Sequence, residues 1–396
     1  MNMLVDGEWR KDAYETTDDD GEFDRQETSF RNWVRDDADA RFTPDAGRYH
    51  LYVSRACPWA HRAAMVRTLM GLEDVISMDV VDPYRDADGW QFTPSKDDCT
   101  YDTVNGAEYL REVYTAADDE FTGRVTVPVL WDREEGTIVN NESAEIIKMF
   151  ADAFGDFAST DADLYPQALR DDVDEVIEAI YDPINNGVYR AGFADSQDAH
   201  ERAVSELFDA LEHWNAELED RRWLVDEQFT LADVCLFTTL VRFDEVYHTH
   251  FKCNVANVTD FDALWGHTRD VYQLPGIAST VNMAHIKEHY YTTHTDVNPK
   301  RLVPVGPDPA FDAEHDRGEL PGEHLRVLTH GRSLTVTVNY CHPSRWFLPI
   351  KTCFRTDPRT IKPSRGLFEQ TRASHRRKAT AVCDLYGRIY LNFYSV

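Results

Sequence analysis

The sequence predicts two folded domains, an α/β domain followed by an all-α domain, within a chain of 396 residues. Three observations lead to this expectation. Residues 46–155 alternate short β-branched runs with helix-like segments, whereas residues 160–312 show only helically spaced apolar residues. A chain of this length also exceeds what one hydrophobic core usually fills. A hydrophobic share of 42% provides enough apolar side chains for two cores.

The α/β domain begins with a strand, a helix and a second strand. "YHLYVSR" is rich in aromatic and β-branched residues and predicts a strand, and "VISMDVV" predicts another. Between them, "PWAHRAAMVRTLMGL" predicts a helix, with Pro58 in its first turn and Gly71 near its end. Elements in this order form a βαβ unit with parallel strands.

A long polar insertion, residues 82–124, separates this unit from the second half of the domain. Two short strands, "VTVPVLWD" and "GTIVN", and a helix, "NESAEIIKMFADAF", then follow. This order of elements is that of a thioredoxin-like domain, in which the proline before the third strand, Pro128 here, is commonly cis. Residues 1–45 are acidic and predict an extended N-terminal arm.

The all-α domain is predicted from five segments with helically spaced apolar residues. They are "LRDDVDEVIEAIYDPI", "DAHERAVSELFDALEHWNAELED", "TLADVCLFTTLVRFDEVYHTHF", "DFDALWGHTRDVYQL" and "IASTVNMAHIKEHYYTTH". The proline-rich "NPKRLVPVGPDP" leads out of this domain. Residues 313–396 are predicted to be a basic, poorly ordered extension.

Charge is distributed unevenly along the chain, whose formal net charge is −30. Residues 331–396 hold 12 basic and 3 acidic residues, whereas residues 1–330 hold 29 basic and 68 acidic residues. Concentrated salt screens such self-repulsion, so we expect an enzyme adapted to a salt-rich cytoplasm. The acidic body excludes nucleic acid as a partner. The basic tail leaves a second hypothesis open, a cationic arm that binds nucleic acid or the acidic body.

Other features indicate where the protein acts. No apolar run is long enough to span a membrane, and the N-terminus lacks the pattern of a secretory signal. We therefore expect a cytoplasmic protein. Its seven cysteines are scattered without framework spacing, which favours reduced thiols over a disulfide scaffold.

The strongest candidate for chemistry is Cys57 in "SRACPWAHR". A cysteine just before a helix lies beside free N–H groups and the positive end of the helix dipole. Its thiol pKa can fall from about 8.5 into the range of roughly 3.5–7.5. Ala60 stands where a dithiol oxidoreductase carries a second cysteine. A mixed disulfide on Cys57 must therefore be resolved by an outside thiol. The alternative is a buried cysteine that acts as a small hydrophobe.

A second helix start, "VNNESAEII", places Glu142 and Ser143 side by side. One hypothesis is helix capping, in which these side chains accept hydrogen bonds from first-turn N–H groups. The other is that they hold the amino and carboxyl groups of a γ-glutamyl moiety at a helix N-terminus. Both roles are compatible.

Five segments together resemble the xi-class glutathione transferases, the glutathionyl-hydroquinone reductases. They are "SRACPWAHRAAMVRTLMGLEDVISMDVV", "GRVTVPVLWD", "NNESAEIIKMF", "YDPINNGVYRAGFA" and "HIKEHYYTTHTDVNPKRLVPVGP". The similarity covers about residues 1–312. A Cys-Pro-x-Ala turn would also suit omega-class transferases, but "DGWQF" in the insertion and "NNGVYRAGF" favour the xi class.

The resemblance implies a role for each candidate residue. Cys57 would be the nucleophile, and Tyr189 and Tyr290 would reach over the aromatic substrate, with Tyr291 as the alternative to Tyr290. The residues implied in binding the thiol co-substrate are Trp90, Arg124, Val127, Glu142 and Ser143. Without the resemblance, Trp90 could serve in packing, Arg124 in a surface ion pair and the tyrosines in the core.

The implied reaction removes the thiol adduct from an S-glutathionyl-hydroquinone. Cys57 attacks the sulfur, tyrosine hydroxyls assist the departing ring, and a second thiol resolves the mixed disulfide. The co-substrate would be glutathione or γ-glutamylcysteine, because the acidic composition points to salt-loving archaea, which tend to use the latter. The resemblance also implies a homodimer and no metal.

Three other hypotheses compete with this one. The first is a general monothiol thioltransferase or dehydroascorbate-type reductase that uses the same Cys57. The second is a non-catalytic, transferase-like interaction module with an inert Cys57. The third is a metal site on His285 and His289, one helical turn apart, with His248 and His250 nearby, but no clear third ligand accompanies them.

Overall fold

The computed structural model describes residues 2–323 apart from residues 14 and 25, then residue 325 and two further strands. These strands, β7 (Lys378–Cys383) and β8 (Ile389–Tyr394), pair in antiparallel fashion. The chain divides into two compact units at residue 334. Most of the extension predicted from residue 313 lies outside the described residues. The prediction that this extension is poorly ordered therefore concerns residues outside the described part of the chain.

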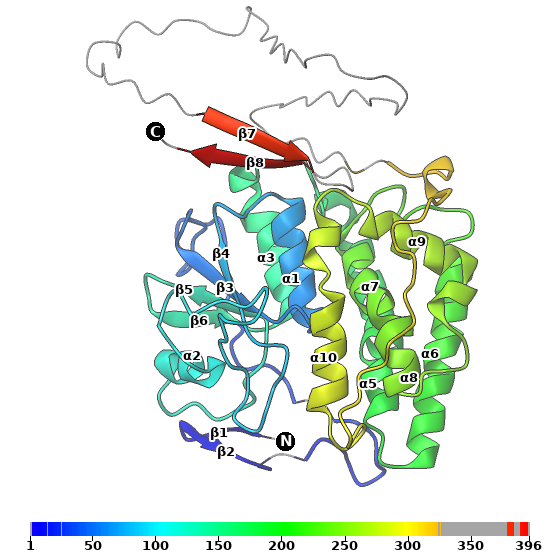
Figure 1. Ribbon diagram of the computed structural model, residues 1–396, viewed down its shortest axis with the longest axis horizontal. Coiled ribbons are helices and arrows are strands. Elements are labelled where there is room, and N and C mark those ends of the chain that lie inside the picture. The colour runs from blue at the N-terminus through cyan, green and yellow to red at the C-terminus, as the bar shows by residue number, and fades with distance from the viewer. Residues whose placement is uncertain are drawn as a thin grey trace, which may run out of the picture. The chain divides into compact units, whose positions relative to one another are not determined.

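A four-stranded mixed sheet with strand order β4-β3-β5-β6 forms the centre of the first domain (Figure 1). Strand β3 runs parallel to β4 and antiparallel to β5, and β6 pairs antiparallel with β5. This is the expected thioredoxin-like arrangement, and the Val127–Pro128 peptide bond is cis. The elements of this domain are β3 (Tyr49–Val53), α1 (Pro58–Leu69), β4 (Ser77–Val80), α2 (Leu110–Ala117), β5 (Val129–Asp132), β6 (Thr137–Asn140) and α3 (Ser143–Ala153).

Helix α1 belongs to the first domain and packs against both domains. It begins with Pro58 and is followed by Gly71, whose φ of +63° suits glycine best. The helix packs against α3 of its own domain and against α7 (Leu231–Arg242) of the helical domain. Burial on both sides explains why almost every α1 residue, His61 and Arg62 included, is buried. The start of α1 is therefore held from both domains.

The second domain is helical, as predicted. Its elements are η2 (Gln167–Leu169), α4 (Arg170–Ile180), η3 (Tyr181–Asn185), α5 (Gly187–Gly192), α6 (Gln197–Glu217), α7, η4 (Phe243–Tyr247), α8 (His248–His250), η5 (Val258–Asp260), α9 (Asp262–Tyr272), η6 (Ile277–Thr280) and α10 (Met283–Thr293). Helix α7 is buried along its whole length and starts with a capping box formed by Thr230 and Asp233. Two predicted helices, residues 169–184 and 230–251, are interrupted by the π-helical turns η3 and η4.

The N-terminal arm is packed onto the fold rather than extended into solvent. Its hairpin, β1 (Met3–Val5) and β2 (Glu8–Arg10), is joined to the first domain by a backbone bond from Leu4 N to Gly123 O of 3.0 Å. Met3, Leu4, Val34 and Phe42 are buried. These few buried apolar residues stand in an otherwise acidic sequence, which explains why composition alone predicted a more exposed segment.

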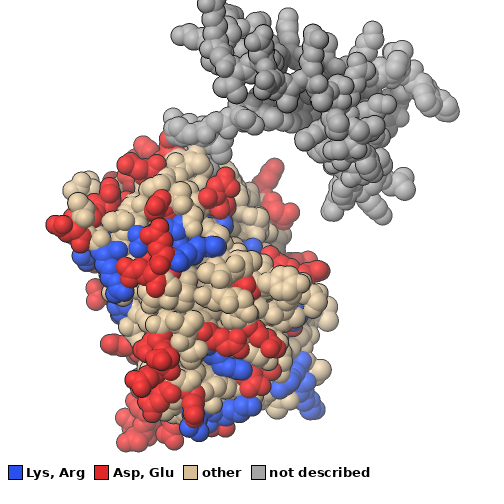
Figure 2. All heavy atoms as spheres, turned by 90° about the vertical axis from the view of Figure 1, so that its left-hand side faces the viewer, with Lys and Arg blue, Asp and Glu red and all other residues tan. Residues whose placement is uncertain are grey.

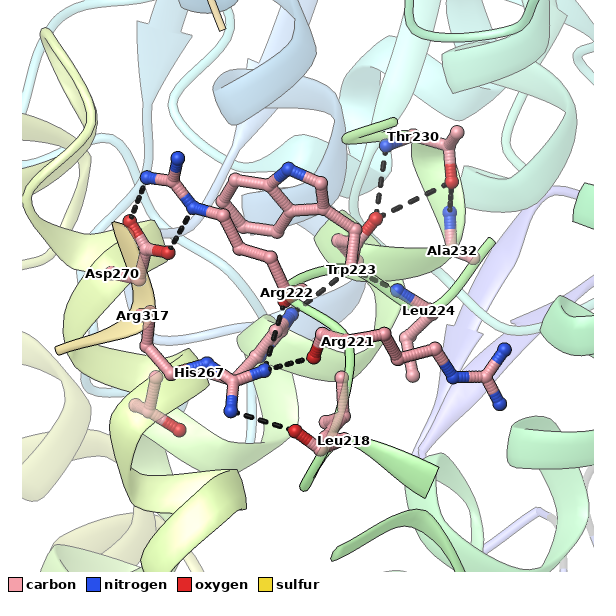
Figure 3. A network of polar contacts seen from close by, with 12 residues as sticks. Leu218, Arg221, Arg222, Trp223, Leu224, Thr230, Ala232, His267, Asp270 and Arg317 are labelled. Atoms are coloured by element: carbon pink, nitrogen blue, oxygen red, sulfur yellow. Dashed lines mark hydrogen bonds and ion pairs between the residues drawn. The ribbon is translucent and has the colours of Figure 1, made fainter. Parts of the chain in front are cut away.

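Residues 313–323 also pack against the folded body, so the boundary predicted at residue 312 comes too early. Arg317 is only 3% exposed and donates hydrogen bonds to the backbone carbonyls of Leu218, Arg221 and Arg222 (Figure 3). Arg222 in turn forms an ion pair with Asp270 at 2.7 Å. Trp223 Nε1 also donates to the Glu323 carbonyl, and Arg269 donates to the Glu314 carbonyl. Buried Arg317 and these bonds thus anchor a segment whose sequence has no strong apolar pattern.

Acidic side chains cover much of the body's surface. In Figure 2 they are spread over the visible face and outnumber the basic ones. Within the described part of the chain, none of the helices is both long enough and apolar enough to span a membrane.

Candidate active site

A pocket lies where the first domain meets the helical domain, with about 660 Å³ of empty space, partly open to solvent. Six of the eight predicted site residues line it: Cys57, Trp90, Arg124, Val127, Tyr189 and Tyr290. The remaining lining residues are Phe23, Trp59, Arg85, Thr126, Phe193, His289 and His294. The structure thus brings together residues that are more than 230 positions apart in the sequence.

Cys57 occupies the N-cap position of α1, with extended backbone dihedrals of −75° and 122°. This position places the sulfur beside the positive end of a three-turn helix. The thiol is partly buried and lies 3.6 Å from the Val127 carbonyl oxygen, next to cis-Pro128. The geometry combines access for a substrate with a local field that favours an anion.

Arg85, which sequence analysis did not identify, brings a positive charge into the same pocket. It comes from the insertion and lies 5.5 Å from the centre of the Trp90 ring. Burial lowers the pKa of Arg85, and interactions with Cys57 and Tyr189 act in the opposite direction. An arginine stays protonated in proteins. Its charge therefore faces both the sulfur and the tyrosine side of the pocket.

Three tyrosine hydroxyls form a cluster on the helical side. The Tyr290 oxygen lies 2.5 Å from that of Tyr189 and 3.0 Å from that of Tyr247. Tyr247 was missed by sequence analysis and lies at the end of the π-helical turn η4. Tyr291 instead donates to the Glu245 carbonyl at 3.1 Å. Of these two tyrosines only Tyr290 lines the pocket, which favours Tyr290 over Tyr291 as the residue that faces a substrate.

The titratable groups on this side are uncharged at neutral pH. Burial raises the pKa values of Tyr189, Tyr247 and Tyr290. Burial, followed by the charge of Arg85, lowers the pKa of His289 to about 3, and burial lowers the pKa of His294 well below its usual range. The helical wall thus offers neutral hydroxyl donors and neutral imidazoles to a substrate.

Trp90 serves both in packing and in lining the pocket. Its side chain is 4% exposed, and its ring stacks on His289 with the ring centres 5.0 Å apart. The packing hypothesis for Trp90 is confirmed, and its role in binding the thiol co-substrate stays a prediction. The contact also ties the insertion of the first domain to α10.

Glu142 and Ser143 lie at the start of α3 and are not among the residues that line this pocket. The Glu142 carboxylate accepts a hydrogen bond from the Ala144 N–H at 3.2 Å, which confirms the capping hypothesis for this residue. It also accepts from Thr28 Oγ1 at 3.3 Å, and Ser143 Oγ lies 3.5 Å from the same carboxylate. A role for this pair in binding a γ-glutamyl group stays a prediction.

Histidines that suggested a metal site serve other contacts. His285 bonds to the Asp97 carbonyl at 2.9 Å and His289 to the Pro83 carbonyl at 2.7 Å. Among the residues that the structure describes, no three His, Cys, Asp or Glu side chains come together in a way that could hold a metal ion.

Both domains match known protein-family models. Residues 56–153 match the family model for the N-terminal domain of glutathione S-transferases, and residues 197–272 match the model for their C-terminal domain.

Individual proteins to which the chain is similar indicate the class within this family. The chain is 46% identical to glutathionyl-hydroquinone reductase YqjG of Escherichia coli over 323 residues, which cover 80% of this chain and 98% of the relative. It is also 46% identical to glutathionyl-hydroquinone reductase PcpF of Sphingobium chlorophenolicum, covering 78% and 96% of the two chains. A solved xi-class transferase from Natrialba magadii shares 61% identity and a TM-score of 0.78, with 82% of this chain and 98% of that chain covered.

Proposed function

The chain belongs to the xi class of the glutathione transferase family, and we propose that it is a thiol-dependent reductase of S-glutathionyl-hydroquinones. One observation carries the proposal. Cys57, at the N-terminus of α1, faces a pocket whose opposite wall presents the Tyr189 and Tyr290 hydroxyls. A sulfur nucleophile and neutral hydrogen-bond donors are what cleavage of an aryl thioether requires.

In the first step the Cys57 thiolate attacks the sulfur of the substrate's thioether. A disulfide bond forms between Cys57 and the thiol adduct while the bond from that sulfur to the ring carbon breaks. The electron pair of the broken bond stays on the ring carbon, which takes up a proton. The adduct sulfur is thereby oxidised and the ring is reduced. Hydrogen bonds from Tyr189 and Tyr290 to the ring oxygens stabilise the negative charge that builds up on the departing ring.

In the second step a free thiolate attacks the adduct sulfur of the mixed disulfide. The attack releases an oxidised thiol dimer and restores the Cys57 thiolate. Because Ala60 replaces a second cysteine, an incoming thiol must serve as the resolving group. Trp90, Arg124 and Val127 would hold the thiol adduct while it is bound to Cys57, and Glu142 and Ser143 would bind its γ-glutamyl end from the start of α3.

Glutathione is supported as the co-substrate by a solved structure described as the glutathione-bound form of YqjG from Escherichia coli. That structure shares 44% identity with this chain at a TM-score of 0.73, covering 80% of this chain and 99% of that one. γ-Glutamylcysteine remains the second candidate, since it carries the same γ-glutamyl group. The difference between the two is the glycine carboxylate, which Arg124 would contact.

Steady-state assays with a synthetic glutathionyl-hydroquinone test the proposal. In molar potassium chloride with excess free thiol, we expect release of the free hydroquinone and one oxidised thiol dimer for each turnover. Running glutathione and γ-glutamylcysteine in parallel would identify the preferred thiol. Purified, folded protein that releases no hydroquinone with either thiol would contradict the assignment.

We also propose a salt-rich cytoplasm as the working environment and a homodimer as the assembly. The excess of acidic residues in positions 1–330 supports the first. Raising potassium chloride from about 0.1 to 1 M shortens the Debye length from about 10 to 3 Å and should raise the melting temperature. Light scattering in molar salt measures the assembly directly.

A further inference from the structure

Arg242, the last residue of α7, holds the backbone immediately before Cys57. Its side chain is fully buried. The Nε–H group donates to the Ala56 carbonyl at 3.0 Å, and Nη2 donates to the Arg55 carbonyl at 3.1 Å. Nη1 donates to the Thr238 carbonyl at 2.7 Å, within the last turn of α7 itself. A guanidinium from the helical domain thus contacts two consecutive residues of the reactive turn in the other domain.

The fourth hydrogen bond of Arg242 fixes the tautomer of a buried histidine. Nη1 lies 3.0 Å from His61 Nδ1, and since a guanidinium can only donate, Nδ1 must accept. His61 Nε2 therefore carries the hydrogen and donates to Thr280 Oγ1 at 2.7 Å, which donates onward to the Ile277 carbonyl at 2.7 Å. Burial, followed by the charge of Arg242, lowers the pKa of His61, so the ring stays neutral.

The positive charge of Arg242 influences the titratable groups beside the pocket. Each hydrogen bond it donates within the described residues ends on a neutral acceptor, three carbonyls and the neutral imidazole. Its charge lowers the pKa of Tyr247 and of Tyr290, against the larger effect of burial. A charge in a buried site acts more strongly than the same charge in water.

We propose that Arg242 is a positioning residue for the thiol chemistry: it fixes the turn that carries Cys57 and supplies a buried positive charge that favours the thiolate. The inference rests on the proposed function, because it assumes that Cys57 reacts as a nucleophile. It also accounts for the role of His61, whose fixed tautomer completes the set of acceptors around the guanidinium. Arg242 itself is not among the residues that line the pocket.

Arg317 offers a matched control elsewhere in the helical domain. It too is a buried guanidinium that donates to backbone carbonyls, those of Leu218, Arg221 and Arg222. These acceptors belong to the helical domain and not to the Cys57 turn (Figure 3). Loss of a buried arginine that donates hydrogen bonds to backbone carbonyls should destabilise the fold at both position 242 and position 317. Only the loss of Arg242 should change the reactivity of the Cys57 thiol.

The pH dependence of Cys57 alkylation by iodoacetamide, followed by peptide mass spectrometry, separates the two effects. The other titratable or charged groups around Cys57 are Arg55, His61, Arg85, Arg124, Tyr189, Tyr247, Tyr290, His289 and His294. The arginines stay charged, the tyrosines have raised pKa values and the three histidines have lowered ones. The profile near neutral pH therefore reports on the Cys57 thiol.

For Arg242→Met in the full chain, we expect the alkylation profile to move to higher pH by about one unit, so that alkylation is about tenfold slower at pH values below the wild-type pKa of Cys57. Arg242→Lys keeps the charge but not the fork of donors, and should return the profile most of the way to wild type. Arg317→Met should lower the melting temperature and leave the profile unchanged. If Arg242→Met does not fold in molar salt, Arg242→Gln, which retains one amide donor, replaces it with the same expected shift.

A folded Arg242→Met or Arg242→Gln protein with the wild-type profile would overturn the inference, and so would an equal shift in Arg317→Met. Alkylation needs no hydroquinone, so this result is independent of the proposed substrate. A shifted profile in a protein that reduces no glutathionyl-hydroquinone would leave the role of Arg242 intact and defeat the proposed function instead.

Discussion

The two walls of the pocket differ in chemistry. The first-domain wall carries a sulfur at a helix N-terminus, a backbone carbonyl and two arginines: Cys57, Val127, Arg85 and Arg124. The helical wall carries neutral hydroxyls and imidazoles, whose pKa values burial has moved away from neutrality. The first wall suits exchange of a thiol, and the second suits stabilisation of an aromatic leaving group. The two half-reactions should therefore respond to different substitutions.

Removing the sulfur should abolish both half-reactions. For Cys57→Ser we expect loss of hydroquinone release by at least about a thousandfold, because no mixed disulfide can form. Initial rates of hydroquinone release measure the loss. Cys99→Ser is the matched control, since Cys99 is also partly buried in the first domain, but burial raises its pKa to about 12. Comparable activity in Cys57→Ser and wild type would show that another group performs the attack.

A substitution in the helical wall should slow hydroquinone release more than thiol exchange. In Tyr290→Phe we expect kcat for hydroquinone release to fall about a hundredfold, the usual cost of one lost donor to a developing oxyanion. Exchange with a small glutathione mixed disulfide should change less than about threefold, because no aromatic ring departs there.

Tyr291→Phe is the control for this comparison, as its hydroxyl donates to the Glu245 carbonyl away from the pocket. Equal losses in both assays for Tyr290→Phe would favour the general thioltransferase hypothesis and a purely structural tyrosine.

Neutralising the carboxylate at the start of α3 should weaken thiol binding. Glu142→Gln keeps an oxygen that can accept from the Ala144 N–H, but it loses the charge that would meet a γ-glutamyl amino group. We expect KM for the glutathionyl-hydroquinone to rise about tenfold with kcat little changed.

Ser196→Ala controls for capping, because Ser196 accepts from the Ala199 N–H at the start of α6, within the helical domain. It should cost about 1 kcal/mol of stability without altering KM. An unchanged KM in Glu142→Gln would restrict Glu142 to capping.

Acid should destabilise the helical domain through two buried histidines, His289 and His250. The pKa of His289 is lowered to about 3 and that of His250 to about 4, against 6.5 in the unfolded chain. The unfolded state thus binds more protons between these values, so stability is retained above pH 6.5 and falls as pH drops toward 4. Thermal unfolding from pH 7.5 to 4.5 should show this slope, and His250→Gln should flatten it. A slope identical to wild type would contradict burial of neutral His250.

Shortening the chain should have the smallest effect on activity. A chain ending after residue 325 keeps the Arg317 anchor, and we expect wild-type activity and melting temperature. A chain ending after residue 312 loses the three hydrogen bonds of Arg317 and further ones made by residues 313–323 to the helical domain. It should melt at a lower temperature while retaining activity at 25 °C. Loss of activity in the longer of these two proteins would show that the basic extension contributes to catalysis.

The fold and the position of Cys57 at the start of a helix could be predicted because their signals are local. A strand, Cys57, Pro58 and a helix follow one another in the sequence, and Ala60 can be identified directly. Tyr247 could not be predicted, because it lies within the π-helical turn η4, which changes the helical phase that the apolar spacing implied. Arg242 could not be predicted, because α7 is buried along its whole length and its spacing does not indicate which residue faces the Cys57 turn. Arg85 lies in an irregular insertion, where no periodicity indicates which way a side chain faces.

A single-turnover experiment tests the central claim most directly. Wild-type protein is mixed with an excess of glutathionyl-hydroquinone in molar salt without free thiol, and intact mass and released hydroquinone are measured together. We expect one glutathionyl adduct per chain, located on Cys57 and reversed by added thiol, with one hydroquinone released for each adduct. Hydroquinone release without an adduct, or an adduct on another cysteine, would contradict the account.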